Sequence, residues 1–158
     1  IVYEALKEAA AKGQAPAQGL LIPEVVELAV EDVARLADHA QTFSSLGLTI
    51  EPFGPGAVVV RETPAALKTF DIKGLVKELA EEVAEWDEAH GLETRLNRVA
   101  ATIACHGSVR SGRHLKVEEM NALLRQIEHT PAASQCNHGR PTFIALSLSD
   151  IEKLFARR

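Results

Sequence analysis

The sequence predicts an α/β fold, and three observations support this prediction. Apolar residues recur at helical spacing in several separate segments. Between these segments lie shorter stretches rich in Val, Ile and Leu, two of which are joined by the turn sequence Gly54-Pro55-Gly56. With 158 residues, 46% of them hydrophobic, the chain is long enough to bury a core without disulfides or metal ions.

The first segments predict a helix followed by a strand. Apolar residues at helical spacing place a helix over residues 1–11, and Gly13 ends it. We expect this helix to continue one that begins upstream. Residues 20–28 are β-rich but include Pro23. Because proline cannot donate a backbone hydrogen bond, this strand belongs at a sheet edge or at a bulge.

The next part of the chain predicts a helix and a hairpin. Residues 31–46 carry apolar side chains on one helical face, and Gly47 stops the pattern. Two short strands follow over residues 48–53 and 57–62, on either side of the Gly-Pro-Gly turn.

Two helices occupy the centre of the chain. Asp71 is placed to cap a helix whose apolar face runs as far as Trp86, and His90 and Gly91 separate it from a second helix over residues 92–105. The polar face of the first helix is acidic, and its members are Glu78, Glu81, Glu82, Glu85, Asp87 and Glu88. Such a run is usually a solvated face, and a metal-binding carboxylate cluster is the alternative.

The last third predicts a helix, a strand and a final helix. Residues 117–129 are amphipathic and end at Thr130-Pro131. A strand over residues 142–148 follows, and Ser149 begins a capping box for the last helix.

Charge and hydropathy limit the classes of function. A net charge of −5 argues against a protein that coats DNA with a uniformly basic surface, so any contact with nucleic acid must be local. We find no apolar run long enough to span a membrane and no signal peptide, which favours a soluble protein of the cytoplasm with no membrane partner. Because the chain begins at Ile1 without an initiator Met, we expect it to be a fragment.

Two cysteines and two histidines are the best candidates for chemistry. Cys136 and His138 stand in a stretch that glycine and proline keep out of regular structure, and Cys105-His106 lies 31 residues before Cys136. A thiolate and an imidazole suit a soft or borderline cation such as zinc. This incomplete set of ligands indicates an open site. The alternatives are two unrelated core thiols or a disulfide between the only two cysteines.

A basic run follows directly after Cys105-His106. It contains Arg110, Arg113, His114 and Lys116 within seven positions. Such a run is suited to holding phosphates near a metal. It is equally typical of a helix end, where cations complement the dipole and Gly112 would supply a left-handed cap.

The order of these motifs resembles that of the C-terminal domain of the MutL DNA mismatch-repair family. Three segments carry the resemblance, and they are Ala104-Cys105-His106, Cys136-Asn137-His138-Gly139-Arg140-Pro141 and Phe155-Ala156-Arg157. They are similar to the family motifs A-C-R, C-[PN]-H-G-R-P and F-x-R, in that order, and the second motif is highly specific. An unrelated α/β domain with two buried thiols is therefore the weakest interpretation.

The resemblance implies a metal-dependent endonuclease that nicks one DNA strand. The implied zinc ligands are Cys105, His106, Cys136 and His138, and manganese is the implied second ion. His106 stands where the motif has Arg, so it is either a further imidazole ligand or simply fills that place. Glu4 is similar to the last Glu of an upstream family motif, D-Q-H-A-x-x-E-x-x-x-x-E, whose other residues are absent from the chain. We therefore expect only part of an active centre.

The remaining implied site residues are cationic. Arg140, together with Glu4, is a catalytic candidate. The residues implied to contact DNA are Arg110, Arg113, Lys116 and Arg157.

A second site is implied by the segment from Gln18 to Pro23. It resembles the Q-x-L-[LI]-x-P segment through which MutL proteins bind the replication sliding clamp, and its members are Gln18, Leu20, Leu21, Ile22 and Pro23. The Gln amide can hydrogen-bond in a pocket while the aliphatic side chains fill an apolar groove, and the proline limits the entropy lost on docking. Without the resemblance, an edge strand is the simpler interpretation.

The resemblance also implies an architecture and partners. Residues 1–28 and 104–158 would form a discontinuous dimerisation and endonuclease lobe, and residues 29–103 an inserted external lobe of helices and strands. The implied partners are a second copy of the chain, the sliding clamp, DNA and the mismatch-recognition protein MutS. The alternative function is a dimerisation and clamp-docking module without nuclease activity in this fragment.

Overall fold

The computed structural model describes residues 1–67, 70–86, 90–109, 112–136 and 140–155. It divides the chain into two compact units, Val2–Arg113 and His114–Arg158, the second together with Ile1. The predicted mixture of helices and strands is confirmed, whereas the predicted discontinuous lobe and its boundaries remain a prediction.

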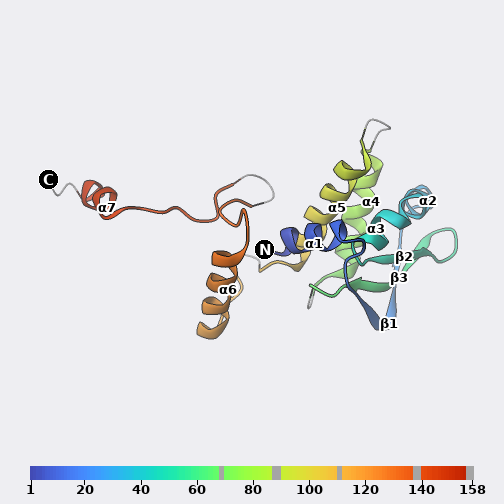
Figure 1. The fold of residues 1–158 in the computed structure, drawn as a ribbon. Coiled ribbons are helices and arrows are strands. Elements are labelled where there is room, and N and C mark those ends of the chain that lie inside the picture. The colour runs from blue at the N-terminus through green and yellow to red at the C-terminus, as the bar shows by residue number, and fades with distance from the viewer. Residues whose placement is uncertain (68–69, 87–89, 110–111, 137–139, 156–158) are drawn as a thin grey trace. The chain divides into compact units, whose positions relative to one another are not determined.

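The unit Val2–Arg113 combines helices with a small antiparallel sheet (Figure 1). The sheet has three strands in the order β1-β3-β2. The strands are β1 (Ala17–Glu27), β2 (Thr49–Pro52) and β3 (Ala57–Pro64). The helices are α1 (Val2–Ala11), α2 (Val30–Asp38), α3 (Ala40–Ser45), α4 (Ile72–Ala84) and α5 (Leu92–Gly107).

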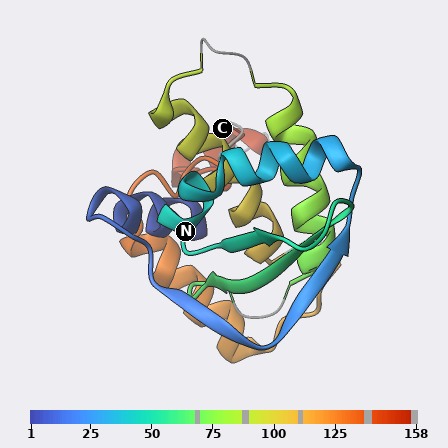
Figure 2. The same ribbon diagram turned by 90° about the vertical axis from the view of Figure 1, so that its right-hand side faces the viewer.

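The core lies between the sheet and these helices. Val58 and Val60 on β3 are almost fully buried, and Val26 of β1 and Ile50 of β2 lie in the same apolar cluster. The helices supply the facing side chains, including Leu36, Phe43, Leu75, Leu79, Val99 and Ile103. Figure 2 shows the helices gathered on one side of the strands. Burial of these apolar side chains is the main force that fixes α4 against β1 and α5 against α1 and α4.

Strand β1 is interrupted by a wide bulge. Gly19 pairs with Glu62 and Glu24 pairs with Val60, so four residues of β1 lie opposite the single residue Arg61 of β3. Figure 2 shows the resulting bend in β1. Pro23 lies inside this bulge, on an edge strand, where the ladder requires no hydrogen bond from its nitrogen. The prediction for this proline is confirmed.

Most predicted helices are confirmed, with one break. Asp71 caps α4, because its side chain accepts a hydrogen bond of 3.0 Å from the backbone N–H of Gly74. The predicted helix over residues 31–46 is instead divided into α2 and α3 at His39, which has φ −108° and ψ 13°. The break leaves both Leu36 and Phe43 with no exposed surface. Both side chains are thus buried on either side of the break.

The unit His114–Arg158 contains α6 (Val117–His129) and α7 (Leu148–Leu154). The predicted strand over residues 142–148 is wrong. Its residues 143–147 have no ladder partner in the described part of the chain, and a strand needs a neighbouring edge. The capping box of α7 is built by Ser147 and Asp150, two residues before the predicted one. Neither α6 nor α7 has a buried residue.

In the described residues, no helix combines the length and the apolar character that crossing a bilayer requires.

Candidate functional site

The bulge in β1 contains the predicted clamp-binding residues. Leu21 and Ile22 are 99% and 80% exposed, which is unusual for aliphatic side chains in a strand. Leu20 instead packs partly against the core. Gln18 and Pro23 are exposed at the two ends of the segment. The bulge thus packs one half-buried leucine against the core and presents the next two aliphatic side chains to solvent.

The strand register explains why Leu21 and Ile22 are exposed. The partners of Gly19 and Glu24 are two residues apart on β3, and strand rise makes that separation about 7 Å. The five backbone steps from Gly19 to Glu24 reach about 17 Å when extended. The chain between them must therefore leave the ladder. Arg61, opposite the bulge, forms an ion pair with Glu51 of β2 and stays on the sheet.

The last turn of α5 carries Cys105 and His106. Cys105 is partly exposed, and the imidazole of His106 is only 7% exposed. Nε2 of His106 lies 2.7 Å from Oε2 of Glu78 on α4, so the ring N–H donates to this carboxylate. Glu78 itself is 54% exposed. The structure therefore gives His106 a carboxylate partner that the sequence did not reveal.

Two glycines lie close to this turn. A Cβ at Gly74 would lie 2.4 Å from Oδ2 of Asp71 and 3.5 Å from Cε1 of His106. A Cβ at Gly107, the last residue of α5, would lie 2.0 Å from Cδ2 of Leu67. The C-terminal turn of α5 is consequently held from two directions.

The second cysteine lies in a loop of the unit His114–Arg158. Its backbone N–H donates to the carbonyl of Arg140 at 2.7 Å, and an isolated bridge joins Gln135 to Pro141. Cys136 is partly exposed and forms no disulfide in the described part of the chain, and Arg140 is exposed. His138 lies outside the described residues.

The other predicted metal and DNA contacts are dispersed. Glu4 is half-buried on α1, which packs against α5. In the described part of the chain, no three His, Cys, Asp or Glu side chains come close enough to hold a metal ion. The chemistry of the predicted set still suits zinc, since it combines thiolates with imidazoles.

The basic run connects α5 to α6. α5 already ends at Gly107, so Gly112 does not cap it, although its φ of +87° is left-handed as expected. Arg113 and Lys116 are exposed, and the side chain of Glu119 accepts a hydrogen bond from the Lys116 backbone N–H. Arg110 and Arg157 lie outside the described residues. The helix-end interpretation of this run is therefore not supported for α5.

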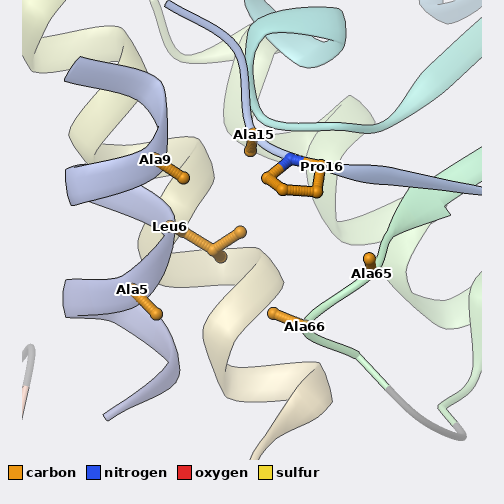
Figure 3. Close-up of a pocket in the computed structure, with 7 residues that line it drawn as sticks. All are labelled: Ala5, Leu6, Ala9, Ala15, Pro16, Ala65 and Ala66. Atoms are coloured by element: carbon orange, nitrogen blue, oxygen red, sulfur yellow. The ribbon is translucent and has the colours of Figure 1, made fainter. Parts of the chain in front are cut away.

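One pocket lies beside α1. Figure 3 shows that it is lined by Ala5, Leu6, Ala9, Ala15, Pro16, Ala65 and Ala66. None of these side chains can ligate a metal or transfer a proton. The pocket therefore contributes nothing to the predicted chemistry.

Comparison with known proteins gives consistent matches. A family profile described as the MutL C terminal dimerisation domain matches residues 1–115. The chain is 61% identical, over 157 residues and 99% of its length, to a DNA mismatch repair protein MutL of Sinorhizobium fredii, of which it covers 26%. It is 60% identical over 99% of its length to the MutL protein of Allorhizobium ampelinum, covering 25% of it, and 59% identical over 99% to that of Agrobacterium fabrum, covering 26%. The chain spans about a quarter of the length of these curated relatives.

Proposed function

The chain belongs to the family of MutL C-terminal dimerisation domains, and we propose that it joins two copies of a DNA mismatch-repair protein, docks on the sliding clamp and carries part of a metal-dependent DNA-nicking site. The match covers residues 1–115 and includes the β1 bulge and the last turn of α5. The remaining segment carries the Cys136 loop. DNA and MutS are the further partners that this function requires.

Exposed apolar side chains support homodimerisation. In the described part of the unit His114–Arg158 they are Val117, Met120, Leu124, Phe143, Ile144, Leu146, Leu148, Ile151, Leu154 and Phe155. A set of this kind is typical of a surface that is covered in the assembled protein, and a two-fold interface would bury it on both copies at once.

Sedimentation of the full-length protein tests the dimer. We expect Met120→Glu with Leu124→Glu to shift the protein toward the monomer, because charges would enter an apolar interface. Asn121→Glu, on an exposed position of the same helix, is the matched control. An unchanged dimer in the double variant would remove α6 from the interface.

The exposure of Leu21 and Ile22 in the β1 bulge is the observation that supports docking on the sliding clamp. An apolar groove on the clamp would take these two side chains, and Gln18 would hydrogen-bond beside them. The flanking ladder residues hold the bulge before docking. Little conformational entropy is then lost on binding.

The nicking site would use Cys105, Cys136 and His138 as zinc ligands, with Glu4 and upstream carboxylates completing it and helping to place a second ion such as manganese. When bound, such ions polarise a phosphate and lower the pKa of an attacking water. Arg140 would orient the scissile phosphate. The other cations, Arg110, Arg113, Lys116 and Arg157, would hold the DNA backbone.

A second candidate function is dimerisation and clamp docking without nuclease activity in this fragment. It is favoured by one observation, the exposure of Leu21 and Ile22 in the β1 bulge, which docking would use and a nicking site would not. Elemental analysis separates the two functions. Zinc or manganese that appears in the full-length protein and falls in its Cys136→Ser variant supports the nicking site, whereas absence of both metals supports the docking module.

A further inference from the structure

The enclosed side chain of His106, next to Cys105, is hydrogen-bonded to a neighbouring helix. Polar side chains are rarely enclosed unless they are hydrogen-bonded, and His106 is 7% exposed with its Nε2 held by Glu78 at 2.7 Å. The pair joins two helices that are distant in sequence, because Glu78 belongs to α4 and His106 to α5. This contact therefore fixes the end of α5 against α4.

Contacts on both sides of His106 restrict the same turn. Gly74, about one helical turn before Glu78, lies beside the ring, and even a Cβ there would be only in ordinary van der Waals contact with Cε1 of His106. Gly107 fits against Leu67, which is 2% exposed. Ser108 donates a hydrogen bond of 2.6 Å to the carbonyl of Ala104 and closes the end of the helix.

Cys105 is a partly exposed residue of this turn. Ile103 and Ala104 are buried before it, and the His106 side chain is held after it by Glu78. Cys105 thus lies in a turn whose neighbouring side chains are packed. Rigid support of this kind is what a metal ligand requires from the residues behind it.

We propose that Glu78 and His106 are a positioning pair, in which Glu78 acts through the His106 ring to hold the Cys105 thiol in one orientation, and that His106 is not itself a metal ligand. The proposal rests on the metal role of Cys105 proposed above. A ligand nitrogen must present its lone pair to the ion, but Nε2 already donates to Glu78. Only Nδ1 remains for a metal, on a ring that is almost wholly enclosed.

Variants of Glu78 in the full-length protein test the positioning role. Zinc affinity is measured by competition with a chelator, and the alkylation rate of the metal-free Cys105 thiol is followed by peptide mass spectrometry. We expect Glu78→Ala to weaken zinc binding by about ten- to a hundredfold and to change the alkylation rate severalfold. Glu81→Ala, at an exposed carboxylate of the same helix, is the matched control and should leave both values unchanged.

Variants of His106 distinguish positioning from ligation. The amide of His106→Gln can still donate to Glu78 from near the position of Nε2, but it has no ring nitrogen for a metal. We expect His106→Gln to stay within about threefold of the wild type in both measurements, and His106→Ala to resemble Glu78→Ala. A loss of zinc in His106→Gln as large as in Cys105→Ser would overturn the proposal, because it would make His106 a ligand.

The same measurements separate this proposal from the proposed function. If the wild-type protein binds no zinc, the metal site fails, while a changed Cys105 alkylation rate in Glu78→Ala still supports the positioning pair. If Glu78→Ala lowers only the melting temperature, with alkylation and zinc affinity as in Glu81→Ala, the pair merely stabilises the fold and the proposal is wrong.

Discussion

The β1 bulge and the last turn of α5 depart from ordinary burial in opposite directions. The bulge exposes the aliphatic Leu21 and Ile22, whereas the turn encloses the polar His106. Single exposed leucines are common, but adjacent ones held out of a ladder indicate a binding surface. An enclosed imidazole with a carboxylate partner indicates precise placement of its neighbours. Exposed aliphatic side chains, as in the bulge, are thus what the proposed docking needs, whereas an enclosed polar side chain, as in the α5 turn, is what the proposed support of a neighbouring residue needs.

The largest expected effect is loss of metal, and it should occur in only one of the two regions. We expect Cys105→Ser to weaken zinc binding in the full-length protein by more than about a hundredfold, because a hydroxyl is a poor ligand for zinc. Clamp affinity, measured by surface plasmon resonance on the same sample, should remain unchanged. Equal loss of both activities would show that the two regions are not independent.

Variants in the β1 bulge should lose clamp affinity and keep their zinc. Leu21→Ala with Ile22→Ala is expected to weaken clamp binding roughly ten- to a hundredfold, or about 1.4–2.8 kcal/mol, while zinc content and melting temperature stay unchanged. Leu20→Ala is the contrasting variant. Because Leu20 packs partly against the core, its truncation should lower the free energy of unfolding by about 1–2 kcal/mol. Clamp binding that survives the double variant would rule out docking through the bulge.

Local signals in the sequence predicted much of the fold. The bounds of α6 follow from its amphipathic period and from Thr130-Pro131, and the bulge follows from a proline in a β-rich segment. The absent strand over residues 142–148 shows the limit, because strand formation depends on a partner that local composition does not reveal. The break at His39 likewise depends on core packing.

In the candidate site, too, some residues could be predicted from local sequence and others could not. Cys105, Cys136 and the segment at Gln18 were recognisable from motifs. Glu78 was not, because its partner His106 lies 28 residues later and the acidic face of α4 resembles any solvated helix. Contacts between distant residues, rather than the motifs themselves, distinguish a supporting residue from a ligand.

A smaller effect is expected at the first turn of α4, which lies beside the His106 ring. Asp71 caps this helix through Gly74, so Asp71→Ala should lower the free energy of unfolding by about 1 kcal/mol. Urea denaturation measures it, with Asp32→Ala, at an exposed pair with Arg35, as a comparison expected to cost less. If Asp71→Ala also weakened zinc binding, the support of the α5 turn would extend to the α4 cap.

The smallest effect concerns a histidine of intermediate burial. His39 packs edge-on against Trp86, with ring centroids 4.8 Å apart, and the guanidinium of Arg95 lies over the same indole. Burial, and then the charge of Arg95, lower the pKa of His39 below its ordinary value of 6.5, although Asp38 opposes the shift. Because the folded state binds this proton less readily, the contribution of His39 to the free energy of unfolding is fully present above pH 6.5 and falls as the pH drops toward the lower pKa of the folded state.

Melting followed by Trp86 fluorescence at about pH 7.5 and about pH 5.5 tests this contribution. The decrease in melting temperature between the two pH values should be smaller in His39→Gln than in the wild type. An equal decrease would assign the pH dependence to other groups.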